Sequence, residues 1–385
     1  MNSIHIAIDA SVANEQEKAG IATYAANLLS ALQKLDDSNS YTVFTFRPDD
    51  SLVTGGKFKV KPLPGLIQRL PIICEWIVWY AWYYSGFSCL LAAMKPDVFL
   101  SLDFDIPFYK KCPPVCIVYD LTPLLFGNMF PRHFLIRYRW QTRHAVLNAR
   151  KIITISEDAK KDIITHFEIA PEKVAVAYPG FDNRLFKPEI EKEEVDRLRT
   201  RYGLQSPYIL FVGMLHAKKN ILRIIEAFEH LKTEFGIKHK LVIAGKRAWQ
   251  DEIIFARMRS SPFSSDIVFA GYIMSTEVPA LMNGADMFVF PSLHEGFGIP
   301  ALEAMACGTP VITSNTSSLP EVVGDAGLLV NPYDVQEIAG AMYRVISEPG
   351  LRETMSSKGL ERARLFSWQR TARSVLTVLE QAAHG

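Results

Sequence analysis

Cysteine is scarce in this chain, and the usual spacing of a metal site is missing. Five cysteines occur in 385 residues. Cys112 and Cys116 bracket two prolines, with no His or further Cys nearby at the spacing of a zinc site. The first residues reach Asp9 before a signal-peptide core can form. These absences predict a reduced, cytoplasmic protein without a structural metal, whose first segment is a buried strand.

An excess of charge of either sign is also missing. Lys and Arg number 42 and Asp and Glu number 41, so the net charge is +1. This balance excludes a global attraction to nucleic acid or to anionic membrane, so a local patch would have to hold any such partner. The length is comfortable for two domains, and no internal repeat is visible.

Long apolar runs are absent, with one exception at Leu70–Met94. This segment is rich in aromatic residues and approaches the length of a membrane span, but Glu75 interrupts it and no second span follows. Its aromatic content suits a bilayer interface better than a bilayer centre. A buried helix is the alternative, and the sequence leaves both interpretations open.

Short β-branched runs alternate with helical patterns along the chain, which predicts parallel sheets covered on both faces. Two successive sets predict an α/β protein of two doubly wound, Rossmann-like domains that face a cleft. The expected strands are 4–9, 41–46, 58–63, 97–101, 115–120, 151–156, 174–178, 208–213, 240–245, 266–271, 287–291, 310–314 and 327–330. A polar, charged stretch places the boundary near 205, which gives domains 1–205 and 206–365 and a C-terminal helix 366–385 that crosses back to the first domain.

The segment from Phe211 to Asn220 leaves an expected strand and enters an amphipathic helix. Gly213 ends the strand, and Asn220 is placed to cap the helix. Lys218 and Lys219 precede the helix N-terminus, where the dipole disfavours cations unless an anion is bound. The loop therefore predicts a diphosphate site, although paired surface lysines are common.

The segment from Phe290 to Gly308 is the most informative. Pro300 suits the start of a short helix and Gly308 the position just beyond its end. Glu303 is expected in the first turn of this helix and Glu295 in the loop before it, next to Gly296-Phe297-Gly298. Glycines let backbone amides approach a ligand, and carboxylates can accept hydrogen bonds from sugar hydroxyls.

Glu295 and Glu303, with seven residues between them, resemble the E-x7-E motif of glycosyltransferase family 4, a retaining family with the GT-B fold. The segments Gly20-Ile-Ala-Thr-Tyr, Lys218-Lys219-Asn220, Tyr178-Pro-Gly-Phe-Asp182, Gly308-Thr-Pro-Val-Ile-Thr and Phe366-Ser-Trp-Gln-Arg are also similar to that family. The resemblance covers essentially the whole chain, and it is strongest to bacterial mannosyl- and rhamnosyltransferases of surface polysaccharide assembly.

The resemblance implies roles for individual residues. Glu303 would bind the ribose and Glu295 the transferred sugar, while Lys219, helped by Lys218, would neutralise the diphosphate. Gly20 and Gly213 would let the backbone approach the donor. The loops at Gly245 and Tyr272 would lie against the nucleobase, and Gly296, Phe297 and Gly298 would line the donor site.

Two positions depart from the family pattern. Met214 stands where many relatives carry Arg after the glycine of the phosphate loop, and Lys218 is a substitute for that charge. Tyr119 stands where many carry His before Asp120. Tyrosine can donate a hydrogen bond to a sugar hydroxyl but does not titrate near neutral pH. We therefore take Glu295, Lys219, Asp120 and Tyr119 as the catalytic candidates.

These observations predict a retaining hexosyltransferase that moves mannose from GDP-mannose to a saccharide or lipid-linked saccharide. dTDP-rhamnose and UDP-hexoses are rival donors. No DxD-like motif stands where a metal-dependent transferase needs one, so no metal or further cofactor is expected. A sugar-nucleotide epimerase and a non-catalytic nucleotide-sugar-binding partner remain alternatives. A dinucleotide oxidoreductase is disfavoured because no G-x-G-x-x-G follows the first strand.

The stretch Pro131–Lys151 is rich in arginine. A solvated helix face is the default interpretation. Together with the aromatic segment, it also suggests peripheral contact with anionic headgroups on the inner face of the cell membrane, where a lipid-linked acceptor would lie.

Overall fold

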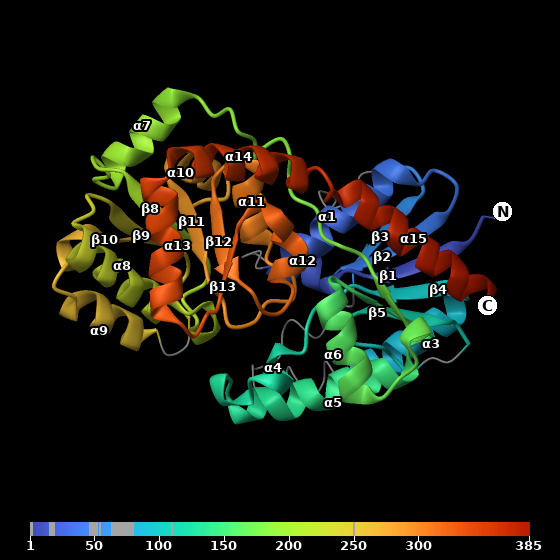
Figure 1. Cartoon of the computed structure of the whole chain (residues 1–385). Helices are drawn as coiled ribbons and strands as arrows, with labels where there is room; N and C mark the ends of the chain where they lie inside the picture. Colours follow the sequence, from blue (N-terminus) through green and yellow to red (C-terminus); the bar gives the residue numbers. More distant parts are fainter. Residues whose placement is uncertain are drawn as a thin grey trace. The chain divides into compact units, whose positions relative to one another are not determined.

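The computed structural model describes residues 3–14, 20–45, 53, 55–62, 81–108, 111–248 and 251–385. The chain forms two compact units. Unit 1 is Met1–Gly180 with Ser367–Gly385, and unit 2 is Phe181–Phe366. In each, the strands lie side by side in one sheet with helices packed around it (Figure 1).

Unit 1 contains a seven-stranded sheet in the order β3-β2-β1-β4-β5-β6-β7, and its described strand pairs are all parallel. Its strands are β1 (His5–Asp9), β2 (Ser40–Thr45), β3 (Phe58–Pro62), β4 (Val98–Ser101), β5 (Pro114–Ile117), β6 (Lys151–Thr154) and β7 (Val174–Val176). Its helices are α1 (Gly20–Leu35), α3 (Phe87–Met94), α4 (Thr122–Leu125), α5 (Arg132–Asn148), α6 (Glu157–Phe167) and α15 (Trp368–His384).

Unit 2 contains a six-stranded parallel sheet in the order β10-β9-β8-β11-β12-β13. Its strands are β8 (Tyr208–Val212), β9 (Lys240–Ala244), β10 (Ile267–Gly271), β11 (Met287–Phe290), β12 (Val311–Ser314) and β13 (Leu328–Val330). Its helices are α7 (Lys192–Arg201), α8 (Ile221–Phe235), α9 (Glu252–Ser260), α10 (Val278–Gly284), α11 (Ile299–Ala306), α12 (Leu319–Val323), α13 (Val335–Ser347) and α14 (Pro349–Ala363).

The two doubly wound parallel sheets predicted from the sequence are confirmed, and every expected strand is present within a few residues. The strands are buried on both faces, as Tyr208–Phe211 illustrates, which explains their continuous apolar sequences. Each sheet reverses its winding once, between β1 and β4 in unit 1 and between β8 and β11 in unit 2. Loops diverge at such a switch point and leave room for a ligand.

The chain leaves unit 1 at Gly180 rather than near the expected boundary at 205. The charged stretch beyond it forms α7, which packs against α10 of unit 2. The last helix, α15, belongs to unit 1, where it packs along α1. A Cβ atom on Gly180 would lie 2.2 Å from the backbone nitrogen of Trp368, so only glycine lets the outgoing and returning segments pass this closely.

The aromatic segment Leu70–Met94 is described from Ala81 onward, and its earlier residues lie outside the described part of the chain. Tyr83, Tyr84, Phe87 and Leu91 are buried against the sheet of unit 1 in one hydrophobic cluster with Phe44 and Phe99. One side of the segment Ala81–Met94 is therefore buried, while Ala81, Ser85, Cys89, Ala92 and Ala93 are exposed. No helix among the described residues is both long and apolar enough to cross a membrane.

Candidate functional site

Two loops meet at the switch point of unit 2. Gly213–Asn220 follows β8, and Pro291–Gly298 follows the neighbouring strand β11. The backbone N–H of Leu293 donates to the carbonyl of Lys218 at 2.8 Å, which ties one loop to the other. Residues that are about 75 positions apart in the sequence thus converge at the carboxyl edge of this sheet, as expected for adjacent parallel strands.

The lysine-bearing loop ends in a 3₁₀ turn, Ala217–Lys219, ahead of α8. Asn220 occupies the N-cap position of α8, as predicted. Its backbone is left-handed, with φ of 60°, and its side chain makes no capping hydrogen bond. The amide instead donates to the carbonyls of Pro291 at 2.9 Å and Pro332 at 2.6 Å, so Asn220 holds three loops together.

Glu295 and the two lysines form a compact ionic cluster. Lys219 Nζ lies 2.6 Å from Glu295 Oε1, and Lys218 Nζ lies 3.9 Å from Oε2. Burial alone would raise the pKa of Glu295, but the charges of Lys219 and Lys218 outweigh it and hold that pKa below its ordinary value. Two ammonium groups around one carboxylate leave a net positive charge, which favours an anionic ligand.

The backbone around Glu295 is fixed by two serines that the sequence analysis did not single out. Ser318 donates its hydroxyl to the carbonyls of Glu295 at 2.8 Å and Phe297 at 3.0 Å. The backbone N–H of Glu295 donates to Ser317 Oγ at 3.1 Å. The serines lie just before α12, and no local pattern links them to Glu295, so only the tertiary structure identifies their role.

In the Gly296-Phe297-Gly298 segment, the one large side chain packs inside unit 2 and the two glycines have no side chain. Phe297 is buried and packs edge-on against Phe366, with ring centroids 5.5 Å apart. A ligand would therefore meet this segment through its backbone. Gly298 has φ of 102°, and a Cβ there would lie 2.6 Å from Leu319 Cδ2. Glycine is needed at this position for both conformation and space.

Glu303 lies in the second turn of α11 rather than in the first, where it was predicted. The helix α11 begins at Ile299 with Pro300 as its second residue, and it has no acidic residue in its first turn. The prediction placed Pro300 at the first helical position, and this shift of one residue moves Glu303 into the second turn. Gly308 follows the helix with φ of 72°, as predicted. Burial raises the pKa of Glu303 to about 8, which favours the neutral carboxyl near pH 7. Hydrogen-bond donors from a ligand would favour the ionised form instead.

Three glycines end the neighbouring strands β8, β9 and β10. Gly245 donates its N–H to the carbonyl of Gly271 at 2.8 Å. A Cβ on Gly245 would lie 1.8 Å from the carbonyl oxygen of Gly213. This edge of the sheet therefore exposes bare backbone. Beside it, the ring of Tyr272 is 64% exposed and has Lys246 Nζ at 4.7 Å from its centroid.

Gly20 and Asp120, the candidates of unit 1, lie at the N-terminus of α1 and just after β5. A Cβ on Gly20 would meet no atom within 4 Å, and residues 15–19 before it lie outside the described residues. Asp120 Oδ1 accepts from the N–H of Thr122 at 2.9 Å. The carbonyl of Asp120 accepts from the hydroxyl of Tyr138 at 2.7 Å.

Tyr119 does not offer its hydroxyl hydrogen to a substrate in this structure. It donates to the carbonyl of Leu102 at 2.7 Å, and its ring packs edge-on against Tyr24. Burial raises the pKa of Tyr119 well above its ordinary value. The hydroxyl hydrogen of Tyr119 is thus engaged in an internal bond, because a buried phenol needs a hydrogen-bond acceptor.

An acidic and phenolic cluster at the switch point of unit 1 was also missed. Asp9 ends β1, and its Oδ2 accepts from the hydroxyl of Tyr83 at 2.7 Å. Asp105, beyond β4, accepts from the hydroxyl of Tyr84 at 2.9 Å, and Gln141 Nε2 donates to both of its carboxylate oxygens at 2.9 Å. Burial raises the pKa of Asp9, and it raises that of Asp105 to about 6. In the sequence, the position of Asp9 at the end of an expected strand was the only signal of this cluster.

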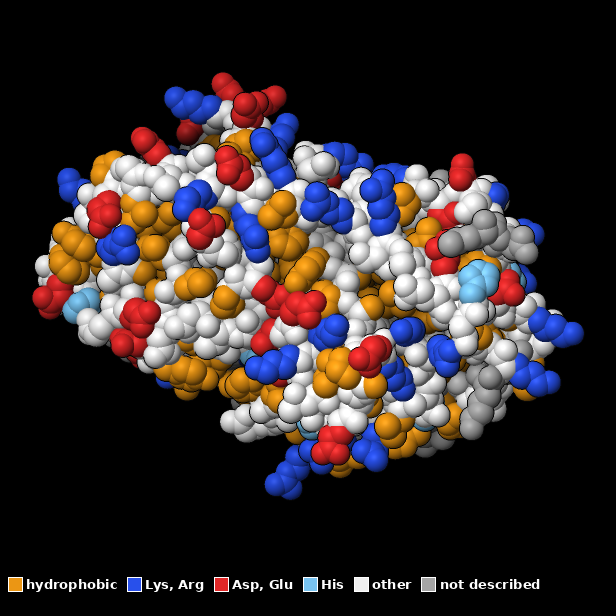
Figure 2. All heavy atoms as spheres, turned by 45° about the vertical axis from the view of Figure 1, so that its right-hand side comes forward, with side chains coloured by type: hydrophobic (Ala, Val, Ile, Leu, Met, Phe, Trp, Pro, Cys, Tyr) orange, Lys and Arg blue, Asp and Glu red, His pale blue; other side chains and the backbone are white. Residues whose placement is uncertain are grey.

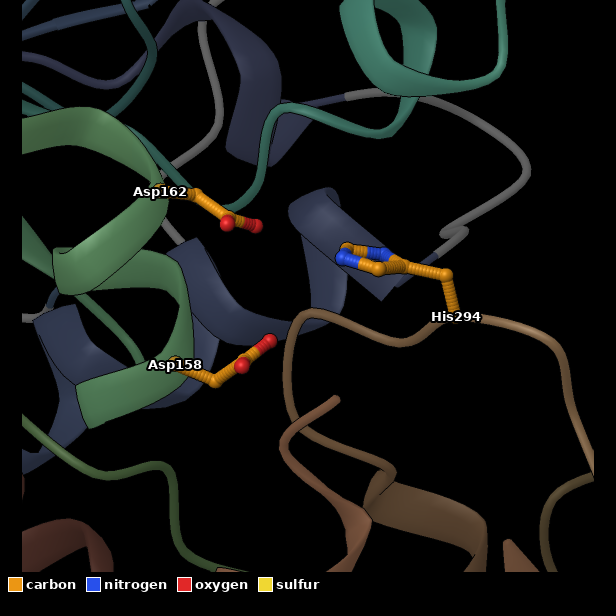
Figure 3. A group of neighbouring side chains, drawn as sticks. All are labelled: Asp158, Asp162 and His294. Carbon is orange, nitrogen blue, oxygen red and sulfur yellow. The ribbon is translucent and has the colours of Figure 1, made fainter. Parts of the chain in front are cut away.

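Potential metal-ligating side chains occur in both units. Figure 3 labels Asp158 and Asp162, which extend from successive turns of α6 in unit 1, and His294, which precedes Glu295 in unit 2. Among the described residues, neither unit alone brings three His, Cys, Asp or Glu ligand atoms within 4.8 Å of one another.

Two family models match the chain, one for each half. The model described as Glycosyltransferase Family 4 matches residues 19–185. The model described as Glycosyl transferases group 1 matches residues 194–362.

Curated relatives include O-antigen chain mannosyltransferase B of Escherichia coli, which is 32% identical over 61% of this chain and 61% of its own length. The serotype-specific mannosyltransferase WbdA of Escherichia coli is 33% identical over 67% of this chain and 32% of its own length. The chain thus matches less than two thirds of these relatives.

Solved structures share the fold over nearly the whole chain. Sucrose-phosphate synthase from Thermosynechococcus elongatus superposes with a TM-score of 0.78 at 19% identity, covering 98% of both chains. Anabaena HepE in complex with UDP-glucose gives a TM-score of 0.73 at 18% identity, covering 98% of this chain and 100% of its own. Together with the two family matches and the E-x7-E glutamates, these likenesses establish that the chain belongs to glycosyltransferase family 4 and has the GT-B fold.

Proposed function

We propose that the protein is a retaining, metal-independent hexosyltransferase that moves mannose from GDP-mannose to a saccharide or a lipid-linked saccharide in surface polysaccharide synthesis. The observation that carries the proposal is the cluster of Lys218, Lys219 and Glu295 at the switch point of unit 2. Its surplus positive charge suits a diphosphate, and Glu303 nearby in the sequence suits a ribose. The mannosyltransferase relatives favour mannose over other hexoses.

In this proposal unit 2 binds the donor. Lys219 and Lys218 neutralise the diphosphate, and the backbone at Gly213 and Gly296–Gly298 approaches the phosphates and the sugar. Glu295 accepts hydrogen bonds from hydroxyls of the transferred sugar, for which its depressed pKa keeps it ionised. The nucleobase lies against Gly245 and Tyr272. UDP-glucose is the ligand of HepE, so a uridine donor is the main rival to guanosine.

Unit 1 binds the acceptor. Gly20 opens the approach to the donor sugar, and Asp120 orients the acceptor hydroxyl. We assign Tyr119 a positioning role, because its hydroxyl anchors the segment before Asp120 to Leu102. Chemically, the bond from the anomeric carbon to the diphosphate oxygen breaks, and the acceptor oxygen bonds to the same face. The departing phosphate takes the acceptor proton, and fixed ammonium groups stabilise its charge.

Thermal unfolding with GDP, UDP, dTDP and their sugar conjugates tests the donor assignment. A ligand that binds the folded state raises its stability with concentration over Kd. We expect the largest shift with GDP-mannose in the wild type and its loss in Glu303→Ala, with the exposed Glu353→Ala on α14 as control. The absence of a shift with every nucleotide would contradict a donor site in unit 2, whereas a shift without any transfer activity would favour a non-catalytic binding partner.

Product analysis tests the reaction. We expect α-configured product from the α-configured donor, and full activity in the presence of a chelator. An inverted anomer would contradict retention, and a magnesium-restored loss in chelator would contradict metal independence. Free epimerised nucleotide sugar in the absence of an acceptor would identify the protein as an epimerase.

A further inference from the structure

One face of α5 exposes apolar side chains to solvent. Ile136 is 73% exposed, and Trp140 and Leu147 are each 50% exposed. Their spacing of four and seven residues places them on one side of the helix. Trp140 is held in place by ring contacts with His144 at 5.6 Å and Tyr84 at 5.3 Å. The face thus presents a positioned indole between two aliphatic side chains.

Three exposed arginines share this face. Arg132, Arg139 and Arg143 lie at helical spacings of three to seven residues from Ile136. At 100° per residue, all the members lie within roughly a third of the helix circumference. We define the α5 outer face as Arg132, Ile136, Arg139, Trp140, Arg143 and Leu147.

The charge of this region differs from that of the rest of the surface. Acidic and basic side chains are mixed over the visible face of the molecule, as the net charge of +1 predicts (Figure 2). From Leu121 to Ser156, by contrast, the sequence has no Asp or Glu but contains five Arg and one Lys. The α5 outer face is therefore cationic as well as apolar.

The opposite face of α5 is fixed in the core. Ala145 is fully buried in a cluster with Cys116 of β5 and Ile152 of β6. Gln141 donates to Asp105 at 2.9 Å, which adds a polar anchor. Rotating the helix to hide its outer face would expose this core, so the apolar side chains of the outer face stay exposed in the isolated protein.

We propose that the α5 outer face lies on the surface of an anionic phospholipid bilayer. Arginines that alternate with exposed aliphatic and indole side chains match an interface, where the charges meet headgroup phosphates and the apolar groups enter the acyl boundary. Acidic protein or nucleic acid would satisfy the arginines but leave Ile136 and Leu147 exposed. This attachment goes beyond the proposed function and does not depend on the donor or the reaction.

Sedimentation of the full chain with vesicles tests this proposal. We expect binding at low salt to vesicles of mixed phosphatidylcholine and phosphatidylglycerol, and much weaker binding to phosphatidylcholine alone. The double variant R139Q/R143Q should lower the partition coefficient about 30-fold, since each basic residue near an anionic surface contributes about 1 kcal/mol. Removing the same charge in R370Q/R373Q, on α15 of the same unit, should leave it nearly unchanged.

The apolar part of the face is tested separately with I136S/L147S. We expect this variant to lose binding although its charge is unchanged, and to keep its circular dichroism because both side chains are exposed. Retained binding in I136S/L147S with loss in R139Q/R143Q would mean that charge alone attaches the protein, without entry of the apolar side chains, and would overturn the proposal. Equal binding of all variants, or no sedimentation of the wild type with the anionic vesicles, would also overturn it.

Discussion

The switch points of the two sheets carry opposite chemistry. After β8 and β11 of unit 2, two ammonium groups surround the carboxylate of Glu295. After β1 and β4 of unit 1, the carboxylates of Asp9 and Asp105 are held by phenols and an amide. Equivalent positions in two similar sheets thus favour different ligands, because an anionic diphosphate gains from the first and is repelled by the second. Fold alone assigns neither role.

Of the variants that test this difference between the two switch points, Lys219→Ala should have the largest effect on activity. The variant removes the ammonium group 2.6 Å from Glu295 and with it the counter-charge that we propose for a departing diphosphate. We expect a roughly 100- to 1000-fold fall in kcat, which is typical of losing one electrostatic stabiliser of a transition state. Steady-state transfer assays measure it, with the exposed Lys238→Ala as control. A fall below threefold would mean that Lys218 alone suffices.

A second prediction compares glycines of the two units. Gly245→Ala places a methyl group 1.8 Å from Gly213 O at φ of 148°, so we expect unfolding to become easier by more than ~2 kcal/mol. Gly20→Ala meets nothing within 4 Å, so it should leave stability nearly unchanged. Denaturant unfolding separates the two. A Gly20→Ala variant that is stable but inactive would indicate that a ligand approaches the backbone at this position. Full activity would show that Gly20 does not belong to the site.

A third prediction uses the buried acids of the two units, whose raised pKa values should make ligand-free stability depend on pH. A raised carboxyl pKa stabilises the folded state below the unfolded pKa, and this contribution is lost as pH rises through the folded pKa. For Glu303 the window runs from 4.5 to about 8, and for Asp105 from 3.8 to about 6. Glu303→Gln should therefore gain stability relative to the wild type as pH rises from 5 to 8.

Thermal unfolding across this range checks the third prediction. The Asp105 contribution serves as an internal comparison, because it should change at lower pH in both proteins. Parallel curves for wild type and Glu303→Gln between pH 5 and 8 would contradict the raised pKa of Glu303.

The smallest effect is expected for Tyr119→Phe. This variant deletes the hydroxyl that donates to Leu102 and leaves one buried carbonyl without that donor. We expect a loss of about 1 kcal/mol in stability and less than a threefold change in kcat. Denaturant unfolding and transfer assays measure the two quantities. A fall in kcat like that of Lys219→Ala, at unchanged stability, would restore Tyr119 as a catalytic residue.

Much of the fold was predictable because its signals are local. Continuous apolar runs such as Tyr208–Phe211 mark strands buried on both faces, and their alternation with helical patterns gave two parallel sheets. The loops that carry the candidates Lys218, Lys219 and Glu295 of unit 2 were located as well, since each follows a predicted strand. The exact turn that holds Glu303 was not found, because helix starts shift by a residue with little local signal.

The sequence by itself determined the strands, their winding and the residue types at the carboxyl edge of unit 2. Only the tertiary structure decided which partner each polar group meets. The side-chain amide of Asn220 donates to Pro291 and Pro332, the hydroxyl of Tyr119 donates to Leu102, and Tyr83, Tyr84, Phe87 and Leu91 are buried against the sheet. Strand and helix patterns are set by neighbours along the chain, whereas a hydrogen bond or ion pair depends on where distant segments come together, which no local spacing encodes.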